Sequence, residues 1–111
     1  MGFLLAFSRK MYLTQYSHGI ERRLNAKTAE KLRYTDTIAE YTSQINDIGD
    51  PDSPAVKKLE ARKAEIEKYE RKIDIEIQKL QTQLQAANTE IQSLDQAVQK
   101  GVQDSFSLKL A

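Results

Sequence analysis

Apolar residues recur along residues 54–108 at alternating spacings of three and four, which is the heptad pattern of a coiled coil. The two heptad positions form a seam: Leu59, Lys63, Ile66, Glu70, Ile73, Ile77, Leu80, Leu84, Ala87, Ile91, Leu94, Val98, Gly101 and Ser105. This seam is apolar without interruption from Ile73 to Val98. A helix with such a seam is not stable when the seam contacts water. The pattern therefore predicts one long helix over about residues 54–108 and a helical partner for it.

The same spacing continues in the first half of the chain and predicts another long helix over about residues 3–48. Its apolar seam positions are Leu13, Ile20, Leu24, Tyr34, Ile38, Tyr41, Ile45 and Ile48, while Ser17, Lys27 and Lys31 occupy three more. The two lysines have two interpretations. Either their alkyl chains lie along the partner helix with the ammonium groups in solvent, or they fix the register or contact carboxylates of another subunit.

The segment between the two patterns, residues 49–53, has the residues of a sharp turn. Gly49 suits the left-handed conformation that ends a helix, and Pro51 cannot continue one. Ser53 is a favourable N-cap, and Pro54 fits the first helical position because its missing N–H is not needed there. A short turn makes the two helices antiparallel neighbours. We therefore predict an all-α fold, an antiparallel two-helix coiled-coil hairpin.

The opening segment, residues 1–16, is apolar on nearly every side of the predicted helix. Because one partner helix cannot cover all sides, such a segment is normally buried by several neighbours or by lipid. We expect an assembly segment, and the alternative is a membrane-surface anchor. The apolar run of residues 2–7 is too short to span a bilayer, and Arg9 and Lys10 follow it, whereas a signal peptide begins with basic residues.

Charge is distributed unevenly along the second helix. Residues 57–79 carry dense charges of both signs at helical spacing, as in Glu67 and Arg71, which is typical of a solvent-exposed helix. Residues 80–99 carry two acidic residues and are otherwise rich in glutamine. Neutral polar side chains can be packed between helices, whereas a buried charge needs a partner. We interpret the turn end as exposed and the end with the two termini as the packed base. Alternatively, glutamine is simply tolerated in helices.

The chain is expected to form one unit over residues 1–111. Its composition argues against several classes of function. With 17 basic and 16 acidic residues the formal charge is +1, so we do not expect a nucleic-acid partner. The chain has no cysteine and a single histidine, His18, so no metal site is expected. The carboxylates have basic neighbours at helical spacing, which suggests solvated ion pairs and not a catalytic acid and base. The glycines do not form a phosphate-binding loop. We predict that the protein is not an enzyme and needs no cofactor.

Two glycines fall inside the predicted helices, although glycine is less favourable there than alanine by about 1 kcal/mol. Gly19 and Gly101 are each expected to allow close approach of the helices or to mark a bend. Alternatively, Gly101 ends the second helix, and residues 102–111 form a separate tail.

The Pro51-Asp52-Ser53-Pro54 turn is followed by Leu59, Glu65, Lys68 and Tyr69, and then by Leu94-Asp95-Gln96-Ala97-Val98 and Val102-Gln103-Asp104-Ser105-Phe106. With these residues, the stretch from Ile48 to Phe106 resembles type III secretion needle subunits, which are helical hairpins with a proline-containing turn. The resemblance implies a subunit that polymerises into a hollow helical filament. In its greater length and its apolar N-terminus, the chain is more similar to related filament proteins of secretion and flagellar systems.

Three functions are considered. The first is a structural subunit whose partner is itself, which assembles through its termini into a filament or tube. Such a subunit is expected outside the cell or at its surface if a route without a cleavable signal exports it, and in the cytoplasm otherwise. The second is a soluble coiled-coil adaptor or chaperone-like hairpin of a secretion or flagellar export system, and the third is a peripheral membrane protein anchored by the opening segment.

The apolar N-terminus favours self-assembly or membrane binding over an adaptor, because a free adaptor would expose an aggregation-prone patch to solvent. Self-assembly is the first hypothesis. The residues expected to form the self-assembly surface are Phe3, Leu4, Leu5, Phe7, Leu13, Tyr16, Val102, Phe106, Leu108 and Leu110.

Overall fold

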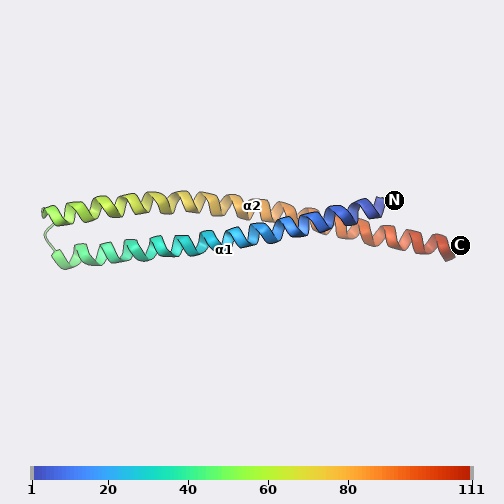
Figure 1. Ribbon diagram of the computed structural model, residues 1–111, viewed down its shortest axis with the longest axis horizontal. Helices are drawn as coiled ribbons and strands as arrows, with labels where there is room; N and C mark the ends of the chain where they lie inside the picture. Colours follow the sequence, from blue (N-terminus) through green and yellow to red (C-terminus); the bar gives the residue numbers. More distant parts are fainter. Residues whose placement is uncertain (1, 111) are drawn as a thin grey trace. The chain divides into compact units, whose positions relative to one another are not determined.

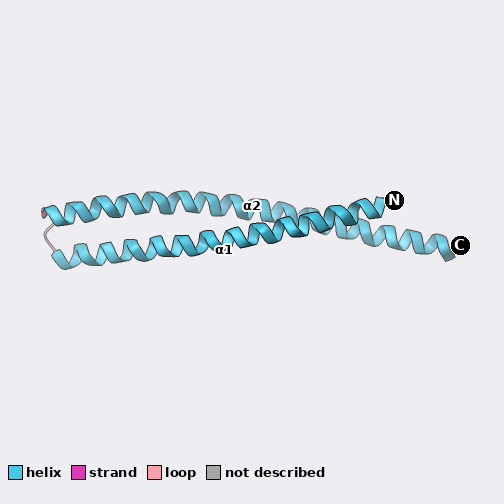
Figure 2. Ribbon diagram, in the orientation of Figure 1, coloured by secondary structure: helices cyan, strands magenta, loops and turns pink. Residues whose placement is uncertain are grey.

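The computed structural model describes the backbone of residues 2–110 and the side chains of residues 2–108. It contains two α-helices, α1 (Gly2–Ile48) and α2 (Pro54–Leu110), which pack against each other (Figure 1). Between the two helices, the described chain leaves the helical conformation only in the short loop seen in Figure 2. The predicted all-α coiled-coil hairpin is confirmed, and the helices are one and two residues longer than predicted.

The turn between the helices is set by hydrogen bonds at both helix ends. Gly49 has a φ of 77°, a conformation that suits glycine, and its N–H donates to the Ile45 carbonyl over 3.1 Å. At the start of α2, the Ser53 hydroxyl accepts a hydrogen bond from the Ala55 N–H at 3.2 Å, and Pro54 is the first helical residue. The local sequence therefore determines where α1 ends and where α2 begins.

Between these helix ends, Asp50 closes the loop. Its carboxylate accepts a hydrogen bond from the Asp52 N–H at 3.0 Å, and its carbonyl accepts one from the Ser53 N–H at 3.1 Å. Pro51 lies between Asp50 and Asp52, where its ring restricts the backbone. Val56, in the first turn of α2, is almost fully buried at 1% exposure. The turn is thus compact, with an apolar side chain packed directly next to it.

The heptad positions of both helices form the contact surface of the hairpin. On α1 the seam continues at the same spacing from Leu13 back to Phe3, and its positions are buried or half-buried from Phe3 to Ile45. On α2 the seam positions are buried or half-buried from Leu59 to Gly101, whereas Ile48 and Ser105 are exposed. The most deeply buried apolar side chains are Leu13, Ile20, Val56, Ile73 and Ala87. Because the core is a narrow line of side chains, little apolar surface is buried per residue, and the fold depends on a small number of positions.

By its internal contacts the chain divides into two compact units, which we describe separately. The loop unit is Leu24–Lys79 and contains the turn, and the terminal unit combines Met1–Arg23 with Leu80–Ala111. In each unit a segment of α1 packs antiparallel on a segment of α2.

In the loop unit, the lysines at seam positions of α1 pair with acidic residues of α2. Lys27 Nζ lies 2.7 Å from the Glu76 carboxylate. Lys31 Nζ lies 2.7 Å from the Asp74 carboxylate. Both lysines therefore pair with carboxylates of the neighbouring helix in the same chain, at positions that favour this register of the two helices.

These contacts predict a loss of stability at alkaline pH. The hydrogen bond to Glu76 raises the pKa of Lys27 above its ordinary value of 10.5. The hydrogen bond to Asp74 likewise raises the pKa of Lys31, and burial raises the pKa of Tyr34 above 10.0. A raised pKa in the folded state gives stability that is present below the ordinary pKa and is lost as the pH rises through the raised value. We therefore expect the unfolding temperature, measured by circular dichroism, to decrease as the pH is raised above about 10.

A Lys27→Met/Lys31→Met variant is the control for this prediction, because it lacks two of the three titrating groups and keeps two unbranched side chains in the seam. Its unfolding midpoint should fall less than that of the wild type over the same pH interval. An equal fall in both proteins would show that the alkaline sensitivity does not arise from these two ion pairs.

Candidate self-assembly surface

Exposed apolar side chains gather in the terminal unit. Among the described residues, thirteen large apolar side chains are exposed, and nine of them belong to this unit, although the two units have nearly equal length. The nine are Leu4, Leu5, Phe7, Met11, Tyr12, Tyr16, Val102, Phe106 and Leu108, with exposed fractions from 40% to 79%. Because monomeric proteins rarely expose large contiguous apolar patches, the terminal unit is the candidate interaction surface.

The structure separates the residues predicted for self-assembly into exposed and buried groups. The exposed residues are Leu4, Leu5, Phe7, Tyr16, Val102, Phe106 and Leu108. Leu13 is buried at 4% exposure and Phe3 is half-buried, because both occupy seam positions and pack inside the hairpin. The side chain of Leu110 lies outside the described residues. Met11 and Tyr12 are exposed but missing from the predicted set, although they belong to the apolar opening segment that indicates this surface.

The exposed residues at the start of α1 form two separate stripes. The Phe7 stripe consists of Leu4, Phe7 and Met11, and the tyrosine stripe consists of Leu5, Tyr12 and Tyr16. Successive residues of an α-helix are rotated by roughly 100°, which places the two stripes and the seam on the order of 120° apart around the helix axis. This segment of α1 therefore has three apolar faces, and α2 covers one of them.

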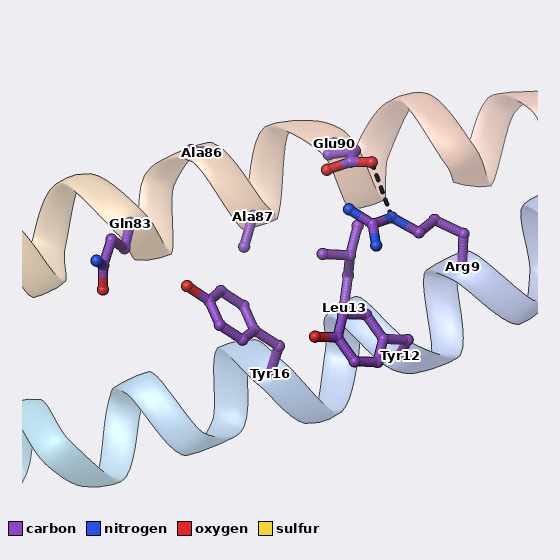
Figure 3. Close-up of a pocket in the computed structure, with 8 residues that line it drawn as sticks. All are labelled: Arg9, Tyr12, Leu13, Tyr16, Gln83, Ala86, Ala87 and Glu90. Atoms are coloured by element: carbon purple, nitrogen blue, oxygen red, sulfur yellow. Dashed lines mark hydrogen bonds and ion pairs between the residues drawn. The ribbon is translucent and has the colours of Figure 1, made fainter.

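The tyrosine stripe borders an open groove between α1 and α2 (Figure 3). This groove has a volume of about 390 Å³ and is lined by Arg9, Tyr12, Leu13, Tyr16, Gln83, Ala86, Ala87 and Glu90. The rings of Tyr12 and Tyr16 are stacked, with centroids 6.4 Å apart and an angle of 15° between their planes. Figure 3 shows the Tyr16 ring reaching from α1 toward α2. Because α2 contributes the small residues Ala86 and Ala87, this tyrosine groove leaves room for side chains from outside.

The charges of this region are paired between the two helices. Apart from a histidine, the charged side chains of residues 2–20 and 80–99 are Arg9, Lys10, Glu90 and Asp95. Arg9 Nε donates to the Glu90 carboxylate over 3.1 Å, and Lys10 forms an ion pair with Asp95. The Arg9 guanidinium also lies 5.4 Å from the centroid of the Tyr12 ring, within the range of a cation–π contact. Another chain can cover such a surface without burying an unpaired charge.

Gly101 allows the two helices to approach closely at the start of α1. A Cβ atom at this position would overlap the Cβ of Phe3. Helix α2 continues through Gly101 to Leu110, so the alternative that this glycine ends the helix is wrong. By contrast, a Cβ at Gly19 would meet only the Arg22 guanidinium, at 4.0 Å, so Gly19 has no such role.

A second, smaller hollow lies next to this close approach. It has a volume of about 210 Å³ and is lined by Phe3, Val102, Ser105 and Phe106. Val102 and Phe106 are 51% and 63% exposed, so the apolar surface of the terminal unit includes residues of α2 as well as α1.

Other kinds of site were sought along the chain. Within the residues that the structure describes, no group of three histidine, cysteine or acidic side chains is arranged to hold a metal ion. His18 lies exposed on α1. Over the same described residues, neither helix has a segment long and apolar enough to cross a bilayer.

Comparisons with protein-family models, with curated proteins and with solved structures found no match to this chain. The role of the terminal unit is therefore inferred from the arrangement of its own side chains.

Proposed function

We propose that the protein is a structural subunit that assembles with copies of itself, through the terminal unit, into a filament or tube. The observation that carries this proposal is the coincidence, in one unit, of exposed apolar side chains with two ion pairs between the helices, Arg9–Glu90 and Lys10–Asp95. Exposed apolar side chains favour association, and a surface that becomes buried needs its charges paired. Both features suit a surface that neighbouring subunits cover.

The amount of exposed apolar surface supports the same proposal. A large side chain has on the order of 200 Å² of surface, so nine such side chains at 40–79% exposure present roughly 1,000 Å². The largest apolar patch of a typical monomer is about 300–600 Å², and each partner of a standard interface contributes about 800 Å². Because this surface is divided among several faces of the terminal unit, it supports several smaller contacts with neighbouring subunits rather than one standard interface.

The directions of the exposed stripes support an open assembly. The Phe7 stripe and the tyrosine stripe differ in composition and face different directions, so a subunit can contact two neighbours through two different surfaces. Contacts of this kind generate a filament whenever the rotation between subunits does not close a ring. The resemblance of the turn and of the second helix to needle subunits supports a role for such a filament in a secretion-type apparatus.

A second candidate function is a soluble coiled-coil adaptor or chaperone-like hairpin of a secretion or flagellar export system. The observation that favours it is the dense charge of residues 57–79 together with the exposed side chains of Tyr69 and Ile75 in the same segment. Aromatic and apolar side chains within a polar rim are common where proteins bind each other. In this case the loop unit would bind the partner, and the protein would remain a small oligomer.

Electron microscopy combined with analytical ultracentrifugation of the full-length protein at neutral pH tests the proposal. We expect uniform filaments that sediment as polymer above a threshold concentration. A Leu5→Glu/Phe7→Glu variant should stay monomeric or dimeric at that concentration, because it places one charge in each outer stripe of α1.

The matched control is a Leu32→Glu/Ile75→Glu variant, which changes two exposed apolar residues of the loop unit (59% and 63% exposed). This control should assemble as the wild type does. A wild-type protein that forms only a homogeneous small oligomer would instead support the adaptor function.

A further inference from the structure

We infer that the Phe7 stripe of one subunit packs into the tyrosine groove of a second copy, so that the assembly is built from one repeated contact between two different surfaces. This inference rests on the proposed function, because it names the partner surfaces of the self-assembling terminal unit. The groove and the stripe lie on the same segment of the hairpin but face different directions. Each subunit can therefore offer its stripe to one neighbour and its groove to another.

One of the two surfaces protrudes and the other is hollow. The Phe7 stripe carries Leu4, Phe7 and Met11, three protruding side chains that are 48–55% exposed. The tyrosine groove has small residues on its α2 side and stacked aromatic rings on its α1 side. Methionine is flexible enough to fill an irregular groove, and its sulfur packs favourably against aromatic rings. Phenylalanine and tyrosine rings likewise contact each other favourably in offset or edge-to-face arrangements.

The charges around the two surfaces are compatible with this contact. The ion pair of Arg9 with Glu90 borders the groove and is already formed within one chain. Lys10, which adjoins the Phe7 stripe in sequence, is paired with Asp95. The contact therefore brings no unpaired charge into the interface, and no charged group has to find a new partner.

A single symmetric contact satisfies these surfaces less well. If the groove of one copy met the groove of another, the Phe7 stripes of both would stay in solvent, and two Arg9–Glu90 pairs would meet across a twofold axis. If two Phe7 stripes met, both grooves would stay empty. A contact between stripe and groove covers both surfaces of every subunit except at the ends of the assembly.

Disulfide cross-linking of introduced cysteines tests this pairing, because the chain has no cysteine of its own. The substitutions are Met11→Cys in the stripe and Ala86→Cys in the groove, made separately and together in the full-length protein. A disulfide requires Cβ atoms about 3.5–4.5 Å apart, so rapid oxidation reports a direct contact. After brief oxidation under assembly conditions, we expect the double variant to give a ladder of covalent multimers on a non-reducing gel. We expect mixed single variants to give mixed dimers, identified by mass spectrometry.

The control is a Met11→Cys/Ile75→Cys variant, in which the second thiol lies at an exposed position of the loop unit. It should give no ladder. A ladder from this control, or efficient dimers from either single variant alone, would overturn the inference while self-assembly itself stands. Wild-type protein that sediments as a monomer under the same conditions would overturn the proposed function and this inference with it.

Discussion

A Glu90→Gln variant is expected to fold as the wild type does but to assemble only at a much higher concentration. In a single chain the Arg9–Glu90 pair is partly exposed, with side chains 51% and 46% accessible, and such pairs contribute about 0.2–1 kcal/mol. In the proposed interface the pair is covered by another subunit. Removal of one partner of a buried pair costs about 3–5 kcal/mol, because the remaining charge has lost its partner.

The measurement is the threshold concentration for polymer formation, obtained by sedimentation, alongside thermal unfolding of the dilute protein. Since about 1.4 kcal/mol corresponds to a factor of ten in an association constant, the threshold should rise by roughly 100-fold to a few thousand-fold. The unfolding midpoint of the dilute protein should change little.

Two variants serve as controls for this effect. An Arg9→Glu/Glu90→Arg exchange restores an ion pair and should recover much of the assembly. Glu65→Gln removes a carboxylate from an exposed position of the loop unit and should leave the threshold unchanged. If Glu90→Gln assembles at the wild-type concentration, the pair is not covered in the polymer, and the proposed location of the interface is wrong.

Opposite effects are expected from the same substitution at the two helical glycines. At Gly19 a Cβ meets no close neighbour, so Gly19→Ala should stabilise the protein by about 1 kcal/mol through helix propensity. At Gly101 the new Cβ would overlap the Cβ of Phe3, which cannot move away by a side-chain rotation. Overpacking of this kind typically costs about 1–3 kcal/mol, so Gly101→Ala should destabilise the protein despite its better helix propensity.

Thermal unfolding of the two alanine variants in the non-assembling Leu5→Glu/Phe7→Glu background measures this difference without a contribution from polymer. A further substitution, Phe3→Gly, removes the Cβ that the methyl group introduced by Gly101→Ala would meet. In that background Gly101→Ala should become stabilising, because the two positions are in contact and their effects are coupled. Destabilisation of equal size with and without Phe3 would show that the clash is not its cause.

The helix ends and the seam could be predicted because their signals are local or periodic. Gly49 and the Ser53–Pro54 pair act on the backbone next to them, and the heptads of α2 keep their phase from the turn to Gly101. No long-range contact is needed for either inference.

The exposure of individual residues in the opening segment could not be predicted from apolarity, because nearly every residue there is apolar. Extension of the heptad phase backward from Ile20 assigns Leu13 and Phe3 to the seam and leaves Met11 and Tyr12 outside it. The position of a residue in the heptad, rather than its hydrophobicity, therefore distinguishes core residues from residues of the candidate self-assembly surface.

The partners of particular side chains depend on the register between the helices. Whether Lys27 reaches Glu76 or another acidic residue, and whether Gly101 lies against Phe3, depends on this register, which the heptad pattern of each helix alone does not specify. Several acidic residues follow each other at helical spacing on α2, so the sequence offers more than one partner for each lysine.

The position of the turn also has a consequence for the order in which the hairpin folds. The hydrogen bond between Thr35 and Glu70 joins residues 35 apart in sequence, whereas the contact between Arg9 and Glu90 joins residues 81 apart. Direct closure of the longer loop from the unfolded chain costs about 0.7 kcal/mol more, and contacts close in sequence form faster. Folding is therefore expected to begin at the turn and to proceed along both helices toward the chain termini. The terminal unit, which carries the proposed self-assembly surface, would then form last. This order limits premature association of chains that have not yet folded.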